Sequence, residues 1–274
     1  MSPETDFYRD VPCLTISNKK QGGSPIVTKL KSLFAETKLL LRNVPSLITA
    51  LFAVSVVAMN LLANKSIVNL PWLALDGGIL FSWLVFLLMD VVTKRFGARA
   101  ANVLSVCALA INLFFSAFFI AASYIPGLWS QSFVEGSEGV INAALDGTIR
   151  SSWFVILGSS IAFLASALLN NFLNMFFGKM LKNRGFLAFS VSCYASTVIA
   201  QFVDNILFAF IVSYHFFGWT PLQCVTCAAT GAVAELLFEV VLSPVGYRAV
   251  KRMEREEVGK AYLDYLAAQK EANV

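Results

Sequence analysis

Residues 187–217 read LAFSVSCYASTVIAQFVDNILFAFIVSYHFF, and Asp204 is the only residue in this run that is ionised at neutral pH. An apolar run of about 18 or more residues with almost no charge is typical of a membrane-spanning helix, because about 20 residues cross the hydrocarbon core. Lipid offers the backbone no hydrogen-bond partners, so the segment must bond internally as a helix. The run therefore predicts a transmembrane helix that contains one carboxylate.

Five further apolar runs are marked in the sequence, at residues 45–62, 76–89, 100–123, 151–177 and 221–245. The chain of 274 residues is 57% hydrophobic and 14% charged, with 24 Phe and a mean hydropathy of +0.69. A soluble domain is roughly 25% charged, so the charge lies well below that norm. The sequence predicts an all-α, polytopic membrane protein with six transmembrane helices.

Lys and Arg alternate between the connections of these runs. One set of connections holds fifteen of them, namely Lys29, Lys31, Lys38, Arg42, Lys94, Arg95, Arg99, Lys179, Lys182, Arg184, Arg248, Lys251, Arg252, Arg255 and Lys260. The other set holds Lys65 and Arg150. Cytoplasmic loops carry the excess of positive charge, so both termini are expected in the cytoplasm of a bacterium and the helices in its inner membrane. Topology thus accounts for the net charge of +4, and we expect lipid rather than nucleic acid as the partner.

Three regions are expected: an N-terminal extension at 1–44, a six-helix transmembrane domain at 45–247 and a basic cytoplasmic tail at 248–274. Apolar residues recur at helical spacing between 26 and 41, at Val27, Leu30, Phe34 and Leu41. This pattern fits an amphipathic helix on the cytoplasmic leaflet, and it fits a loosely ordered lead-in equally well.

Neither a metal nor a cofactor is expected from the sequence. The five cysteines are odd in number, and Cys224 and Cys227 form a C-x-x-C without a second ligand pair in a chain that holds one histidine. The printed sequence contains no G-x-x-x-x-G-K-[ST] string, so we do not expect this chain to hydrolyse ATP.

Asp204 and Glu235 are carboxylates near the middle of predicted helices, where an unpaired charge costs several kcal/mol. No Lys or Arg shares their apolar runs, so a proton, water or a ligand must satisfy them. Gln201 and Asn205 fall on the same helical face as Asp204. We therefore expect Asp204 and Glu235 to bind the donors of a substrate, with Gln201 and Asn205 orienting it.

Other polar residues lie in the remaining runs. Asp90 is close to the cytoplasmic end of its run and has Lys94 four residues later, an arrangement that also fits a simple interfacial ion pair. Asn112 lies at mid-depth in its run, and Asn174 lies near the cytoplasmic end of another. Asparagines of this kind either contact substrate or hydrogen-bond neighbouring helices.

Three motifs resemble one known family. They read Asp90-x-x-Thr93-x-x-Phe96-Gly97, Ser196-Thr197-x-x-x-Gln201-x-x-Asp204-Asn205-x-x-Phe208 and Glu239-Val240-x-x-Ser243-Pro244-x-x-Tyr247. In order and spacing they resemble the signatures of the queuosine precursor transporters, also called VUT-type vitamin-uptake proteins. The resemblance extends over roughly residues 45–255.

The resemblance implies a six-helix fold similar to the substrate-binding components of energy-coupling-factor importers, and uptake of 7-deazaguanine precursors of the tRNA base queuosine. It carries Asp90, Gln201, Asp204 and Glu239 over as functional residues. The chain departs from the family in having Glu235 where Lys is frequent, Asn205 where Thr or Ser is usual, and Lys94 where Glu is frequent.

The resulting prediction is a transporter that imports a small molecule, namely 7-cyano-7-deazaguanine, its aminomethyl analogue or queuine. The predicted substrate-binding residues are Asp204, Gln201, Asn205, Glu235, Glu239, Asn112 and Asn174, and the predicted gating or proton-linked residues are Asp90, Thr93 and Lys94.

Alternatives of other classes stay open. If a separate ATPase module energised transport, the chain would be the substrate-binding subunit of an importer for another vitamin-like or purine-like compound. A homo-oligomer is also consistent with the sequence. An intramembrane enzyme would use Asp90, Asp204 or Glu235 as paired acids. The sequence contains neither G-x-G-D nor H-E-x-x-H, so no enzymatic activity is expected. A non-transporting scaffold would tolerate substitution of Asp204.

Overall fold

The computed structural model describes residues 25–129, 136, 138–181 and 185–272. Predictions for the first 24 residues, and for Lys182 and Arg184, lie outside the described residues. The chain up to Glu36 and residues 37–274 are two separate units. Helix α1 (Pro25–Asn43) occupies the stretch with helical apolar spacing, and its placement on a membrane surface stays a prediction.

Long helices coincide with all six apolar runs. They are α2 (Ser46–Leu62), α3 (Ile79–Phe96), α4 (Ala98–Ala122), α5 (Glu138–Met180), α6 (Gly185–Phe208) and α8 (Pro221–Arg255). The run predicted at 187–217 is α6 followed by a π-helical turn, η2 (Ala209–Ser213), and a short α7 (Tyr214–Phe216). The all-α, membrane-type architecture agrees with the prediction.

Helix length and composition give fewer candidate membrane spans than the six that the sequence predicts. Four segments are long and apolar enough to cross a membrane: α4, α5, α6 with its continuation, and α8. A fifth is added if α1 and α2, which are bent at the break between them, count as one. Helix α2 has only 17 residues, and α3 carries the charged residues Asp90, Lys94 and Arg95. Helix length and composition therefore establish four or five candidates, and six spans remain a proposal.

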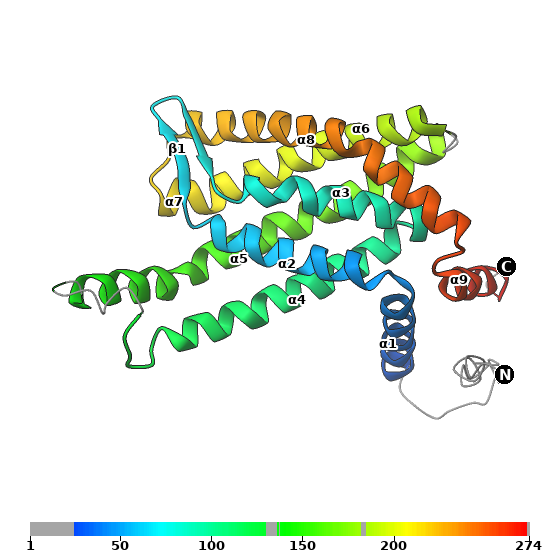
Figure 1. Ribbon diagram of the computed structural model, residues 1–274, viewed down its shortest axis with the longest axis horizontal. Coiled ribbons are helices and arrows are strands. Elements are labelled where there is room, and N and C mark those ends of the chain that lie inside the picture. The colour runs from blue at the N-terminus through cyan, green and yellow to red at the C-terminus, as the bar shows by residue number, and fades with distance from the viewer. Residues whose placement is uncertain (1–24, 130–135, 137, 182–184, 273–274) are drawn as a thin grey trace, which may run out of the picture. The chain divides into compact units, whose positions relative to one another are not determined.

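Within residues 37–274 the long helices pack side by side (Figure 1). Helix α6 contacts α5 and α8, and α3 contacts α2, α4, α5 and α8. Large side chains between them are fully buried, among them Phe52, Phe86 and Phe163. Phe114 on α4 and Val241 on α8 are exposed, which suits a surface that faces hydrocarbon.

A two-stranded hairpin between α2 and α3 was not predicted. Strands β1 (Ser66–Leu70) and β2 (Leu73–Asp76) pair antiparallel and contact the start of α8 (Figure 1). Thr220 and Gln223 form a capping box there, with Pro221 at the first helical turn. The Gln223 amide also donates to the Leu70 carbonyl at 2.8 Å, so the cap of α8 holds the hairpin as well.

The end predicted for the transmembrane domain, residue 247, lies inside α8, which continues to Arg255. Pro244 cannot donate a backbone hydrogen bond to the Val240 carbonyl. The hydroxyl of Ser243 donates to that carbonyl instead, at 3.1 Å, and contacts the Tyr194 hydroxyl at 2.6 Å. The helix therefore passes the proline unbroken, with a side-chain contact to α6.

The C-terminal segment packs against the helices instead of trailing from them. Helix α9 (Lys260–Ala272) begins after Gly259, whose φ of +78° favours glycine and whose added Cβ would overlap the ring of Phe96. Tyr262 is fully buried beside Phe96, with ring centroids 6.4 Å apart. Arg95 donates to the Val258 carbonyl at 2.6 and 3.0 Å. The predicted basic tail is thus fixed to the end of α3.

Removing the Tyr262 ring should therefore loosen α9. We expect Tyr262→Ala to destabilise the protein by about 3 kcal/mol, the usual cost of deleting a buried aromatic ring. Thermal unfolding in detergent and limited proteolysis of the C-terminus measure the effect. Tyr265→Ala, which deletes the same atoms at a half-buried position of α9, is the matched control. Equal effects of the two variants would contradict the docking role of Tyr262.

Candidate functional site

Buried and half-buried polar side chains gather in two places within residues 37–274. The first, which we call the cavity group, comprises Asp76, Ser82, Asp204, Asn205 and Glu235. The second, which we call the Asp90 group, comprises Asp90, Asn170, Asn174, Cys193 and Glu239. Helix α8 connects them, because Glu235 and Glu239 are one turn apart on the same helical face.

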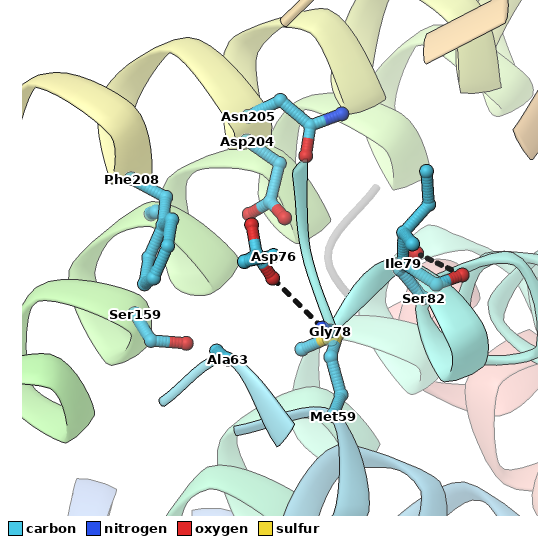
Figure 2. Close-up of a pocket in the computed structure, with 11 residues that line it drawn as sticks. Met59, Ala63, Asp76, Gly78, Ile79, Ser82, Ser159, Asp204, Asn205 and Phe208 are labelled. Atoms are coloured by element: carbon cyan, nitrogen blue, oxygen red, sulfur yellow. Dashed lines mark hydrogen bonds between the residues drawn. The ribbon is translucent and has the colours of Figure 1, made fainter. Parts of the chain in front are cut away.

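Four members of the cavity group, all except Glu235, line a small cavity of about 20 Å³. Its walls come from α2, the hairpin, α3, α5 and α6 (Figure 2). A cavity of this size holds about one water molecule, whereas small-molecule sites are usually roughly 300–1,000 Å³. The structure therefore shows the site in a closed form.

Asp204 on α6 points into this cavity (Figure 2). The Ser166 hydroxyl of α5 donates to Asp204 Oδ1 at 2.8 Å. Asn205 also lines the cavity, and a Cβ at Gly231 would approach its amide nitrogen to 2.6 Å. Gly231 thus lets α8 lie close to Asn205. Gln201, one turn earlier on α6, is fully buried, and neither of its amide atoms has a hydrogen-bond partner within the described part of the chain.

Asp76, the last residue of β2, is a cavity residue that the sequence analysis treated only as the start of an apolar run. Its Oδ1 accepts a hydrogen bond from the Gly78 backbone N–H at 2.7 Å, which turns the chain from hairpin to helix. Burial raises the pKa of Asp76 from 3.8 to about 6, although the Gly78 bond lowers it. The sequence feature that could have identified Asp76 as a turn residue is its position directly before Gly77-Gly78, between apolar residues.

Glu235 on α8 belongs to the same group through Ser82. The Ser82 hydroxyl donates to Glu235 Oε1 at 2.6 Å and itself lines the cavity. Glu235 Oε2 is buried and accepts no hydrogen bond from any residue that the structure describes. Asp204 lies near enough to interact electrostatically with Glu235. One carboxylate oxygen beside the cavity therefore lacks a donor.

The Asp90 group lies where α3, α5, α6 and α8 meet. Asn170 donates to Asp90 Oδ1 at 2.7 Å, and Thr197 lies 3.5 Å from Oδ2. One carboxylate oxygen of Asp90, one carboxylate oxygen of Glu239 and the sulfur of Cys193 lie within 4.8 Å of one another. Of the residues predicted to bind substrate, Glu239 and Asn174 are found in this second group, and neither lines the cavity.

Three predicted residues lie elsewhere. Thr93 donates to Asn171 at 3.1 Å, in a chain of hydrogen bonds between helices. Lys94 donates to Ser192 at 2.5 Å and interacts electrostatically with Asp90. Asn112 is fully buried on α4, is not among the residues that line the cavity, and its amide lacks a partner among the described residues.

The fold and the two buried polar groups define an α-helical membrane protein with an internal polar site. The family described as "Putative vitamin uptake transporter" matches residues 76–249, which is more than half of the chain. The chain therefore belongs to this family of transporters. The matched region includes all of the residues in both groups. Neither the curated proteins nor the solved structures contain a match to this chain.

The raised pKa of Asp76 predicts a pH-dependent stability. Between pH 4 and about 6 the unfolded chain ionises at this residue while the folded protein keeps it neutral, so stability falls as pH rises. We expect Asp76→Asn, which retains the acceptor for Gly78, to melt above the wild type at pH 8 and close to it at pH 4.5. Thermal unfolding in detergent at the two pH values measures this. Asp264→Asn, at an exposed position, is the control, and an equal gain at both pH values would refute the assignment.

Proposed function

We propose that this chain imports a 7-deazaguanine precursor of queuosine across a bacterial inner membrane, with six spans and both termini in the cytoplasm. The family assignment supports transport of a small molecule. The distribution of Lys and Arg supports the orientation. The two additional spans in this proposal are α2, which is short, and α3, which carries charged residues. Both pack among the long apolar helices.

The observation that supports this function best is the set of acceptors around one internal cavity. Asp204 and Glu235 each receive one hydroxyl donor from a neighbouring helix, at 2.8 and 2.6 Å. Oε2 of Glu235 still lacks a donor in the part of the chain that the structure describes. A guanine-like ring presents adjacent N–H groups, which a carboxylate accepts in pairs. Asn205 and Gln201 complete the recognition through their amides.

The acidic lining also bears on the charge of the substrate. Asp76, Asp204 and Glu235 lie together, and no Lys or Arg is found among the described residues that line the cavity. Family members that have Lys in place of Glu235 would neutralise one of these acids. In this chain the substrate supplies the missing donors, which suits the ring N–H groups and the ammonium of the aminomethyl compound.

The closed cavity implies a conformational step. A heterocycle does not fit in about 20 Å³, so entry requires the hairpin and the helices around the cavity to separate. Asp90, Thr93 and Lys94 lie along α3 beyond the cavity, which suits a gate on the cytoplasmic side. In the alternative of a binding subunit, a separate ATPase module energises this movement. Neither that alternative nor a homo-oligomer changes the substrate site.

Uptake of labelled 7-cyano-7-deazaguanine, its aminomethyl analogue and queuine is the direct test. The cells would neither make nor import these compounds without this chain. We expect saturable uptake by the wild type and at least a tenfold loss in Asp204→Asn and in Glu235→Gln, because each loses a charged acceptor. Glu138→Gln, at an exposed position of α5, is the matched control. Normal uptake by both site variants at equal expression would refute this site.

A further inference from the structure

The Asp90 group is a second site that recognition of the substrate leaves without a role. Asp90 and Glu239 are 0% and 2% exposed, and they come from different helices, α3 and α8. Their carboxylates approach within 4.8 Å in an interior of low dielectric. Two carboxylates so close in a dry interior repel each other when both are ionised, so in the structure as it stands one of them is expected to hold a proton.

Buried acceptors that lack a donor also indicate a bound proton. Thr197 and Asp90 face Glu239, but no described residue donates a well-formed hydrogen bond to either of its carboxylate oxygens, and the buried amide oxygens of Asn170 and Asn174 also lack a donor there. A carboxyl O–H provides such a donor. Leaving buried acceptors without a donor is unfavourable, so a proton held between them is favoured.

The donors around the pair stabilise a negative charge on Asp90. The amide nitrogen of Asn170 is directed at Asp90, and that of Asn174 at the Cys193 sulfur, at 2.7 and 3.6 Å. N–H groups of this kind stabilise a carboxylate. Lys94, one turn along α3, adds a positive group near Asp90. This arrangement suits one ionised and one protonated carboxyl.

The titratable groups around the pair are few among the described residues. They are Cys193 on α6, Lys94 on α3 and Glu235 on α8, and α5 contributes only the two neutral amides. Glu235 reaches the substrate cavity through Ser82. Acidic side chains thus follow one another from Asp76 and Asp204, through Glu235, to Glu239 and Asp90.

The other side of the pair leads to a hollow at the opposite end of the helices from the hairpin. Lys94 lines this hollow, of about 140 Å³, together with the exposed residues Lys251 and Glu254. Water in such a hollow comes within one helical turn of Asp90. A proton released by the pair therefore has a short route to the solvent at that end.

We propose that Asp90 and Glu239 form a single-proton site that couples substrate movement to a proton gradient. The inference rests on the proposed function and adds its energy source. The carboxyl O–H bond forms with a proton from the outer side, and it breaks toward the hollow beside Lys94, where water accepts the proton. Glu235 links the two sites, because it contacts the cavity through Ser82 and precedes Glu239 by one turn.

Accumulation in proteoliposomes tests the coupling. The probe is labelled 7-cyano-7-deazaguanine, with the membrane potential held at zero by valinomycin and equal potassium, and with the outside one pH unit more acidic. One proton per neutral substrate gives up to about tenfold accumulation, since one pH unit is a tenfold ratio. We expect this ratio in the wild type and a ratio of about one in Asp90→Asn and Glu239→Gln. The ratio is an equilibrium quantity, so slow transport alone would not lower it. Glu138→Gln is the control and should accumulate like the wild type.

Two outcomes overturn the coupling site. One is tenfold accumulation by both Asp90→Asn and Glu239→Gln, and the other is wild-type accumulation driven by a sodium gradient at equal pH. Counterflow without a gradient separates this failure from that of the proposed function: wild-type counterflow without pH-driven accumulation refutes coupling alone, whereas absent counterflow refutes the substrate.

Infrared spectroscopy tests the proton without any substrate. We expect the protein in detergent at neutral pH to show a protonated-carboxyl band that shifts or disappears in both Asp90→Asn and Glu239→Gln, because each changes the hydrogen-bond partner of the shared proton. The band should persist in Glu138→Gln. A wild-type band that neither site variant changes would refute the shared proton, even if the deazaguanine is not the substrate or a variant does not transport.

Discussion

Carboxylates buried between apolar helices are the constraint on which this structure depends. Three of them accept a side-chain hydrogen bond from a neighbouring helix: Ser166 of α5 donates to Asp204 of α6, Ser82 of α3 donates to Glu235 of α8, and Asn170 of α5 donates to Asp90 of α3. An unsatisfied buried charge costs far more than one hydrogen bond contributes. These pairs therefore fix how α3, α5, α6 and α8 align along their length, which nondirectional apolar packing alone does not do.

The hairpin adds a second constraint at one end of the helices. Gln223 caps α8 and holds β1 with the same side chain, and the Asp76 turn then starts α3 beside the cavity. Moving the hairpin away would withdraw Asp76 from the cavity and loosen the cap of α8. Opening of the site and the position of α8 are thereby linked, and α8 also carries Glu235 and Glu239.

Much of this arrangement is readable from the sequence, because apolar runs and helical spacing are local properties. The runs located the long helices, and the i, i+4 relation placed Glu235 and Glu239 on one face. Spacing along a helix does not say which neighbouring helix each turn meets, so the position of Glu239 beside Asp90 could not be predicted, and its role in substrate binding stays a prediction. Asp76 and the hairpin were missed for a related reason: the turn depends on Gln223, more than 140 residues later in the chain.

The position of the proton site relative to the substrate site has a mechanistic consequence. An anion at Glu239 repels an anion at Glu235, which lies one turn earlier on α8, and repulsion at that distance is strong in a low dielectric. In the proposed mechanism, protonation of the pair therefore favours an ionised Glu235, the form that would accept the N–H donors of the proposed substrate. By linkage, a substrate bound at Glu235 would favour the protonated pair by the same free energy. Two acids on one helical face are sufficient for this reciprocity, without a large rearrangement between the sites.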